Sequence, residues 1–299
     1  MWISLAFLSA FFIGCYDIAK KQSVNNNAVI PVLFLNTFFC SCLLVPLVLI
    51  SKLSPSTLEG SIFFLPSISW EFHGLILIKS TIVLISWIFG YFAVKHLPLT
   101  ITGPINSTRP IMALVGAILI FGEVLNLYQW IGVLLTIISF YLLSRSSKKE
   151  GINFKNNKWI TFMIISTIAG AASGLYDKYL MQRITATSVQ FWFNTYQWMM
   201  MVVVLMLVWY PRRNKGAKFE WRWSILIFSV LLTAADFVYF YALTFPGAMI
   251  SIVSMARRSS VIVSFAGGAL LFKEKNLKGK AFDLLLILIA MFFLYLGTN

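Results

Sequence analysis

Three arginines lie inside long apolar stretches of the sequence, where a charged side chain needs either a function or a partner. Arg109 occurs within residues 99–121, and Arg257 and Arg258 are adjacent within residues 247–271. A guanidinium group at the centre of a bilayer costs about 2.5–3.5 kcal/mol even on the lowest scales. Because arginine binds carboxylate and phosphate through paired hydrogen bonds, we interpret these residues as candidates for binding an anionic group.

The depth of the arginines agrees with that interpretation. Arg257 and Arg258 follow about eleven residues of their predicted helix, which places them roughly 16 Å into a hydrocarbon core about 30 Å thick. Arg109 lies at a comparable depth. Adjacent helical residues point about 100° apart, so we expect one of the paired arginines to face a cavity directly. The alternative is that the arginines pair with Asp236 or with carbonyl groups at helix ends and only stabilise the bundle.

Three aspartates in apolar stretches are candidates for gating or proton coupling, because a carboxylate in lipid can exchange a proton. Asp17 has Lys20 and Lys21 within about one helical turn, which also allows an ordinary intrahelical ion pair. Asp177 is followed directly by a lysine, so a structural pair competes with a coupling role there too. Asp236 has no partner nearby in sequence and is the better candidate for a counter-charge to the arginines.

Other side chains extend the predicted binding set. Lys79, about a third of the way into its apolar stretch, either adds positive charge to a cavity or reaches toward the interface. Tyr16, Tyr176 and Tyr239 are deep aromatics that could line a cavity, although most deep aromatics only pack. Asn194 is a buried amide with a counterpart in the first half of the chain, for which contact between helices competes with contact to substrate.

No residue pattern indicates catalysis. The two histidines, His73 and His96, lie at the ends of apolar stretches without a carboxylate or cysteine at metal-ligand spacing. There is no Walker loop and no nucleophile paired with a base. We therefore predict that the protein is not an enzyme and uses no cofactor or metal. The basic residues are spread over several loops rather than gathered on one face, which argues against a nucleic-acid partner.

The composition requires a membrane protein. Of the 299 residues, 59% are hydrophobic and 11% are charged, which leaves too little polar surface for a soluble globule. Because unpaired backbone groups are costly in hydrocarbon, each apolar run of about 20 residues is expected to be a helix. We predict an all-α membrane protein with ten transmembrane helices, at 2–22, 29–51, 72–95, 99–121, 127–145, 159–182, 188–210, 223–244, 247–271 and 279–298.

The sequence also repeats itself. Residues 14–22 (GCYDIAKKQ) resemble residues 174–182 (GLYDKYLMQ), and residues 116–127 (GAILIFGEVLNL) resemble residues 267–277 (GGALLFKEKNL). A half with an odd number of helices forces its copy to enter the membrane in the opposite direction, so the repeats are expected to be inverted. The predicted units are a five-helix repeat at 1–147, a basic cytoplasmic linker at 148–158 and a second five-helix repeat at 159–299.

Small residues and prolines indicate which helices approach one another or line a cavity. The fourth predicted helix has breaks at Pro104 and Pro110, and the ninth begins at Pro246 and later contains Gly267-Gly268. Such breaks are tolerated in lipid only where protein or a water-filled cavity receives the freed carbonyls, which favours these two helices as cavity walls. Gly14, Gly170 and Gly174 are expected to allow close approach of the first and sixth helices to a neighbour.

Charge sets the expected orientation. Most of the 24 Lys and Arg lie in the connections on the side that is reached after the first predicted helix. The positive-inside rule makes that side cytoplasmic and places both termini outside. We predict a multi-pass protein of the inner (plasma) membrane, with the lipid bilayer as a partner and a monomer as one possible state.

The pattern of spans resembles the EamA family of the drug/metabolite transporter superfamily. The resemblance includes a glutamate, Glu123 and Glu274, that closes the fourth helix of each half before a short turn. The first half has Pro110 thirteen residues before its glutamate, whereas the second half has Val261 at that place. The resemblance implies a carrier of small metabolites with a central cavity that works by alternating access. The arginine pair of the ninth predicted helix also resembles the basic pair at which plastid triose-phosphate translocators bind phosphate.

We therefore predict a secondary active transporter of a small organic metabolite, with an anionic or zwitterionic substrate favoured. A coupling proton or an exchanged metabolite would supply the energy, because no nucleotide site exists. One alternative is a carrier or exporter of neutral or cationic metabolites, such as amino acids, amines or drugs, with the paired arginines held by Asp236. The other is a membrane protein that handles lipids.

Overall fold

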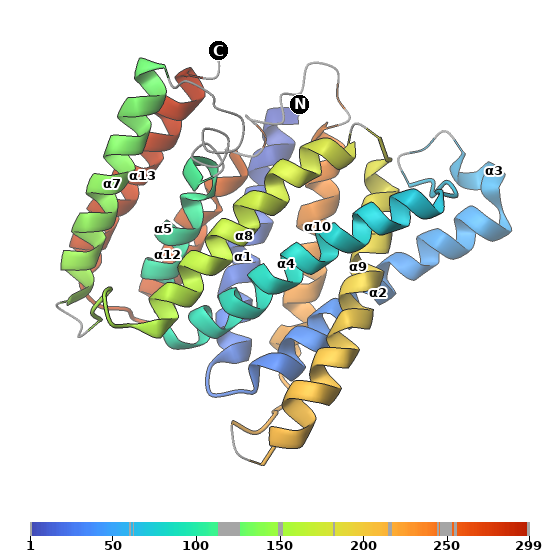
Figure 1. Ribbon diagram of the computed structural model, residues 1–299, viewed down its shortest axis with the longest axis horizontal. Coiled ribbons are helices and arrows are strands. Elements are labelled where there is room, and N and C mark those ends of the chain that lie inside the picture. The colour runs from blue at the N-terminus through green and yellow to red at the C-terminus, as the bar shows by residue number, and fades with distance from the viewer. Residues whose placement is uncertain are drawn as a thin grey trace.

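The computed structural model describes all residues except 1, 60, 62, 113–125, 149–151, 182, 215–216, 244, 246–252, 254–255 and 298–299. Within the described ranges every regular element is a helix (Figure 1). Eight of these helices are long and apolar enough to cross a membrane. Each contains an apolar run of 18 residues with at most two charged side chains. Runs of this length form helices in lipid because a helix satisfies the backbone polar groups internally.

The helices follow one another along the chain with short connections. They are α1 (Trp2–Val24), α2 (Val29–Leu53), α3 (Pro55–Leu58), α4 (Trp70–His96), α5 (Leu99–Ser107), α7 (Leu127–Lys148), α8 (Lys158–Met181), α9 (Ala186–Val204), α10 (Trp223–Leu243), α12 (Ser260–Leu270) and α13 (Leu277–Leu296). A π-helical turn (Leu205–Trp209) and a 3-10 turn (Tyr210–Arg212) continue α9.

Eight of the ten predicted spans correspond to these long helices. The fourth and ninth predicted spans, 99–121 and 247–271, are described only in part, as α5 and α12, and their other residues lie mostly outside the described ranges. Ten spans in two inverted repeats therefore remain a prediction. Of the two breaks expected in the fourth span, the one at Pro110 is present, because α5 ends at Ser107 and a turn at Thr108 precedes the helical residues 109–112. The one expected at Pro104 is not, because Pro104 lies within α5.

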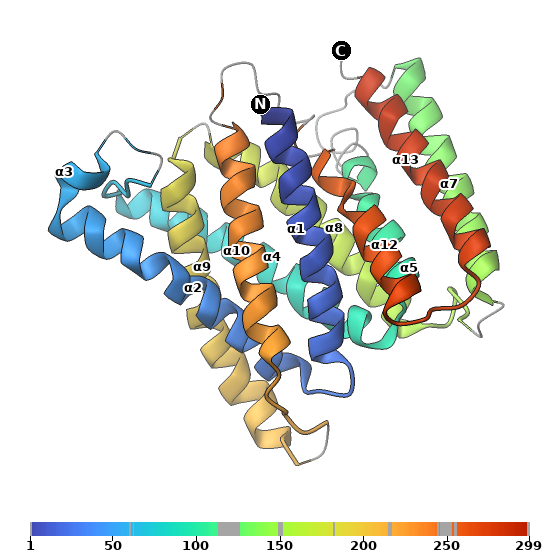
Figure 2. The ribbon, with the colours of Figure 1, turned by 180° about the vertical axis from the view of Figure 1, so that it is seen from behind.

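The helices pack in a reciprocal pattern. α1 lies along α10, and α4 lies along α8. α2 packs on α9, α5 on α12, and α7 on α13, the last pair side by side at one edge of the molecule (Figures 1 and 2). The eight long helices together with α5 and α12 make ten, and the first five can be matched in chain order to the last five. Under this match the α1–α10 pair corresponds to the α8–α4 pair, and each of the other three pairs corresponds to itself.

The outer surface is apolar. Leu134 and Ile137 on α7 and Phe292 on α13 are among the large hydrophobic side chains that remain exposed. Trp70 and Trp223, at the first residues of α4 and α10, are exposed by 89% and 70%. Apolar side chains around the helices with tryptophans at helix ends are the arrangement expected of a bundle in contact with lipid.

The largest apolar cluster of the interior is formed mainly by α1, α2, α4 and α10. Close helix contact depends on small residues at specific positions. A Cβ atom on Gly14 would fall 2.3 Å from Cβ of Val263, so α1 can approach α12 only because residue 14 is glycine. The predicted close approach at Gly14 is therefore confirmed.

Candidate functional site

A cavity of about 790 Å³ lies in the middle of the bundle. The α1–α10 pair forms one wall and the α4–α8 pair forms another. The remaining lining comes from α5, α9 and α12 and from residues 109–110 and 257–258. This volume is within the usual range for a small organic ligand. Gly174 and Leu175 line the cavity and are also exposed, so the cavity reaches the surface near the end of α8.

The charged groups of the chain's apolar stretches meet in this cavity. Its lining contains five basic side chains and three acidic ones. They are Lys20, Lys79, Arg109, Arg257 and Arg258, with Asp17, Asp177 and Asp236. The sequence predicts eleven residues for binding, gating or coupling, and nine of them line the cavity. These nine are Lys79, Arg109, Arg257, Arg258, Asp17, Asp177, Asp236, Tyr16 and Tyr239.

Three ion pairs neutralise part of this charge. Within α1, Lys20 Nζ lies 2.6 Å from Asp17 Oδ1. Lys79 of α4 pairs with Asp177 of α8, which joins the two helices of one wall. The Lys20–Asp17 pair lies instead on α1, in the wall that α1 and α10 form.

The third pair joins Arg257 to Asp236 of α10. Asp236 is the counter-charge that the sequence favoured for the paired arginines. The guanidinium carbon of Arg257 also lies 4.5 Å from the ring centroid of Tyr239, a cation–π distance. Its Nε atom is buried without a hydrogen-bond partner among the described residues.

Arg109 and Arg258 are different, because neither has a hydrogen bond or an ion pair within the described part of the chain. The guanidinium group of Arg109 lies directly against α8, where a Cβ on Gly170 would fall 2.4 Å from Arg109 Cζ. Gly170 thus makes room for an arginine side chain, which is a more specific role than the helix contact predicted for it. Gly174 has no atom within 4 Å of the same position and leaves space in the cavity.

Aromatic rings surround the basic side chains at one end of the cavity. The hydroxyl groups of Tyr16 and Tyr91 form a hydrogen bond of 3.0 Å between α1 and α4. Lys20 Nζ lies 4.4 Å from the Tyr16 ring centroid and 5.5 Å from that of Tyr91. Phe228 of α10 packs edge-on against both tyrosines. We call this region the α1–α4 end of the cavity.

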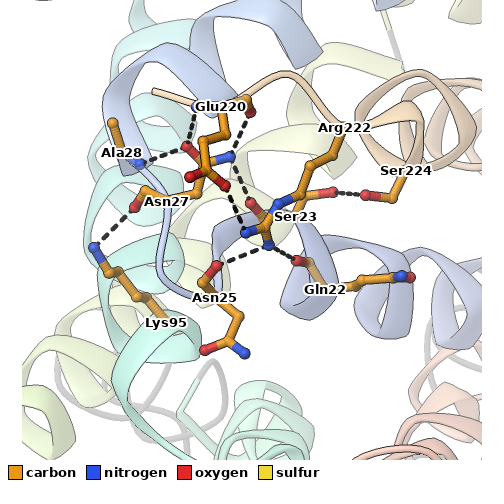
Figure 3. Close-up of polar contacts among 9 residues, drawn as sticks. All are labelled: Gln22, Ser23, Asn25, Asn27, Ala28, Lys95, Glu220, Arg222 and Ser224. Atoms are coloured by element: carbon orange, nitrogen blue, oxygen red, sulfur yellow. Dashed lines mark hydrogen bonds and ion pairs between the residues drawn. The ribbon is translucent and has the colours of Figure 1, made fainter. Parts of the chain in front are cut away.

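Beyond this end, polar contacts connect the two halves of the chain (Figure 3). The side-chain amide of Asn27 pairs with the backbone of Glu220, through Nδ2 to the carbonyl oxygen at 2.8 Å and through Oδ1 from the amide nitrogen at 2.9 Å. Lys95 of α4 donates to the Asn27 carbonyl at 2.8 Å. The three contacts hold the α1–α2 turn between α4 and the segment that leads into α10.

Two further contacts in the same region cap helix ends. Arg222 donates to the carbonyls of Gln22 and Asn25 at 2.6 and 2.8 Å, which satisfies the last turn of α1 (Figure 3). Lys21 donates to the carbonyls of Val94 and Leu97 at 2.6 Å each. Lys21 therefore caps α4, whereas the sequence allowed it to pair with Asp17, because α4 ends within its reach.

The glutamate predicted to close the fourth helix of the second half has a defined role. Glu274 accepts hydrogen bonds from the backbone nitrogens of Leu99 and Thr100 at 2.7 and 2.9 Å. A carboxylate there satisfies free N–H groups and opposes the positive end of the helix dipole. The second half thus caps the first helical turn of α5. Its counterpart, Glu123, lies outside the described residues.

Two predicted binding residues lie outside the cavity lining. Tyr176 packs against the apolar cluster between α4 and α9 and stacks on Tyr179. Asn194 is buried within α9. Its counterpart Asn36 accepts a hydrogen bond from Ser229 at 3.0 Å, a contact between helices. This agrees with the alternative that the two amides serve helix contact.

Sequence reasoning missed two residues of the lining. Lys20 was considered only as a partner of Asp17, and Tyr91 was not singled out. A signal for Tyr91 was available, because Tyr-Phe, then five further residues and then Pro occur at residues 91–98 and again at 239–246. The second copy contains Tyr239, which also lines the cavity.

Comparison with known proteins agrees with the geometry. No curated protein matches the chain. Among 26 matching chains of solved structures, one described only as a crystal structure of a protein has a TM-score of 0.63 and 12% identity, covering 99% of this chain and 98% of that chain. At this identity the similarity shows the fold alone. Residues 1–145, just under half of the chain, are similar to the EamA-like transporter family, which belongs to the drug/metabolite transporter superfamily.

Proposed function

We propose that the protein is a secondary active transporter that carries a small organic anion or zwitterion across the plasma membrane by alternating access. The observation that carries the proposal is the central cavity, in which Arg109 from the first half and Arg258 from the second half have no partner among the described residues. Charged groups inside a membrane bundle are costly and mark ligand or ion pathways. Guanidinium groups without a counter-charge suit a ligand that brings one.

The helix arrangement supports the alternating-access part of the proposal. The reciprocal contacts of α1 with α10 and of α4 with α8 are what two inverted five-helix halves would produce. In this interpretation α5 and α12 belong to the fourth and ninth of ten spans. The two walls of the cavity are then related units that can rock against each other around a fixed site.

Energy would come from a coupled proton or from exchange of one metabolite for another. Asp17 and Asp177 occupy equivalent places in the repeated segments, and each is paired with a lysine in the cavity. A carboxylate that exchanges its lysine partner for a proton changes the charge of the lining by one. The termini are expected outside the cytoplasm, which makes the region of Asn27 and Arg222 the cytoplasmic end.

A carrier of neutral or cationic metabolites is the second candidate. The ion pair of Arg257 with Asp236 favours it, because one of the three arginines is already neutralised by the protein. The two candidates differ in what the remaining arginines, Arg109 and Arg258, do when substrate binds.

A thermal-shift experiment on the purified protein separates them. Ligands that bind only the folded state raise its unfolding midpoint, and at a given concentration a tighter ligand raises it more. We would test carboxylates, phosphate esters, amino acids and quaternary amines. We expect anions or zwitterions to stabilise the protein and Arg258→Gln to abolish the effect. Arg183→Gln is the matched control, because Arg183 is exposed and lies over Tyr179 outside the cavity. Stabilisation by amines that survives Arg258→Gln would favour the second candidate.

A further inference from the structure

The charges of the cavity do not balance, and the imbalance can be assigned to particular residues. The lining has five basic side chains and three aspartates. Each aspartate is joined to one basic side chain in an ion pair. The two basic side chains left over are Arg109 and Arg258, so the described lining has an excess of two positive charges.

The two unpaired arginines also act on each other. The guanidinium group of Arg258 lies within range of electrostatic repulsion by Arg109 and by Arg257. Two like charges in a low-dielectric environment raise the energy of the empty site. A ligand with a single negative charge would neutralise only one of them. A ligand with two negative charges would neutralise both and would bridge the first half of the chain to the second.

We infer that the substrate of the proposed carrier is an organic anion with two negative charges, a dicarboxylate or a phosphate monoester, which binds between Arg109 and Arg258. This inference rests on the proposed anion transport and narrows it. Both ligand types present the oxygen pairs that guanidinium groups bind best. The ion-paired residues of the lining neutralise one another, so the positive charges of Arg109 and Arg258 remain for the ligand to neutralise.

Matched probes test the inference. Succinate and its monoamide succinamate have nearly the same shape but carry two charges and one, and glycerol phosphate supplies the phosphate arm. In thermal-shift titrations we expect a dianion to bind about tenfold more tightly than succinamate. Arg109→Gln and Arg258→Gln should each remove this preference, and Arg183→Gln should keep it. Each Gln variant should also stabilise the protein without ligand, because it removes an unpaired charge.

The possible results separate the inference from the proposed function. Equal binding of succinate and succinamate, lost in both Gln variants, would overturn the inference and leave an anion carrier. No shift with either dianion would also overturn it. Stabilisation by neutral or cationic ligands alone, unaffected by the Gln variants, would remove the proposed function as well.

A separate observation concerns four tyrosines at equivalent places in the two halves. Tyr16 and Tyr176 follow the same glycine in the repeated segments 14–22 and 174–182. Tyr91 and Tyr239 occupy the same position in the repeated Tyr-Phe segments. In this structure the two tyrosines of the first half, Tyr16 and Tyr91, are hydrogen bonded to each other across the α1–α4 end of the cavity.

In the second half, Tyr176 lacks the hydrogen bond that Tyr16 makes in the first half. The hydroxyl group of Tyr176 is buried without a hydrogen-bond partner among the described residues. Tyr239 lines the cavity on α10, opposite α8. α1 is in contact with α4, whereas the described residues of α8 and α10 make no comparable contact. A buried hydroxyl without a partner is costly, and closing the gap between α8 and α10 would give it one.

We propose that a Tyr16–Tyr91 hydrogen bond and a Tyr176–Tyr239 hydrogen bond form in turn. The first closes the α1–α4 end, as seen here, and the second closes the α8–α10 end in the opposite state. The movement of α8 toward α10 brings the Tyr176 hydroxyl to its partner while α1 and α4 separate. This second proposal also rests on alternating access, but it does not depend on the charge of the substrate.

Distances between spin labels test the exchange. Labels at Asn25 and Asn156, both exposed and near the α1–α4 end, report whether that end opens. Tyr16→Phe should increase the population with a longer distance, and Tyr176→Phe should decrease it. Tyr179→Phe is the control, because Tyr179 stacks on Tyr176 but is exposed.

Each outcome has a definite meaning. Two distance populations that none of the tyrosine variants changes would overturn the tyrosine exchange and keep alternating access. A shift in the same direction for Tyr16→Phe and Tyr176→Phe would overturn it too. A single population in every variant, with and without succinate, would count against alternating access itself.

Discussion

The two ends of the cavity are built from equivalent segments of the chain, but different side chains hold them. At the α1–α4 end, Lys20 lies over the tyrosine rings and Lys21 caps α4. The equivalent positions in the second half are Leu180 and Met181, which are apolar. Cationic side chains that satisfy free carbonyls stabilise one end, and nothing of the same kind is available at positions 180 and 181.

This difference shows how a duplicated chain can prefer one state. In the proposed exchange the repeated tyrosines would provide similar hydrogen bonds at both ends, so both closed arrangements would be accessible. The lysines, together with Asn27 and Arg222, add hydrogen bonds at one end only. We therefore expect the state with the α1–α4 end closed to be the more stable one in the absence of substrate.

Replacing the two equivalent glycines should give the largest difference between the halves. A Cβ on Gly14 would fall 2.3 Å from Cβ of Val263 and 3.0 Å from a backbone oxygen, whereas a Cβ on Gly174 would meet no atom within 4 Å. We expect Gly14→Ala to lower the free energy of unfolding by about 2–3 kcal/mol through overpacking. Gly174→Ala should change it by less than about 0.5 kcal/mol.

Unfolding of both variants in detergent measures the effect. Gly74→Ala serves as a further reference, because that position is also open. Similar losses for Gly14→Ala and Gly174→Ala would show that α1 and α8 are packed alike and would remove the difference between the two ends.

Replacing the two equivalent aspartates, Asp17 and Asp177, should give a smaller difference in the free energy of unfolding than replacing the two glycines. Asp177 pairs with Lys79 on another helix, whereas Asp17 pairs with Lys20 in its own helix. We expect Asp177→Asn to reduce stability by about 1–2 kcal/mol, because a buried ammonium group loses its counter-charge and α4 loses a contact with α8. Its side chain is 24% exposed, which limits the loss. The double variant Lys79→Met with Asp177→Leu should recover most of it.

A double-mutant cycle on the unfolding midpoint checks this prediction. The same cycle on Asp17 and Lys20 should give a smaller coupling, of about 0.5 kcal/mol, as for other pairs within one helix. Equal coupling energies in the two cycles would contradict the assignment of Asp177 to contact between helices.

The long helices and the charged centre could be predicted from the sequence for the same physical reason. Lipid forces backbone groups into helices and makes every intramembrane charge expensive, so apolar runs give the spans and charged residues within them give the site. Arg257 and Asp236 illustrate this, because neither has an opposite charge nearby in sequence and the two form an ion pair in the structure.

What could not be predicted depends on how distant helices pack. Lys79 and Asp177 are 98 positions apart, and nothing local indicates that α4 lies along α8. Tyr91 looks like any other deep aromatic until its hydroxyl meets that of Tyr16. Lys20 was ambiguous because a lysine three residues after an aspartate has a partner already, whether or not a cavity lies beside it.

The smallest expected effect on stability concerns Lys21, the lysine that distinguishes the two ends most directly. Lys21→Met gives the first half the residue that the second half has at position 181, and removes the hydrogen bonds to the carbonyls of Val94 and Leu97. A lysine at a helix C-terminus contributes about 0.3–1 kcal/mol, so the loss of stability should be of that size.

The shift between the closed and open states should be easier to detect than the loss of stability, because about 0.8 kcal/mol alters a population ratio roughly fourfold. The distance between labels at Asn25 and Asn156 should shift toward the open α1–α4 end. Lys52→Met, at an exposed position in the last turn of α2, should leave the distance unchanged. If Lys21→Met left it unchanged as well, the lysines would not explain why this end is closed, and the hydrogen bonds of Asn27 and Arg222 would have to account for it alone.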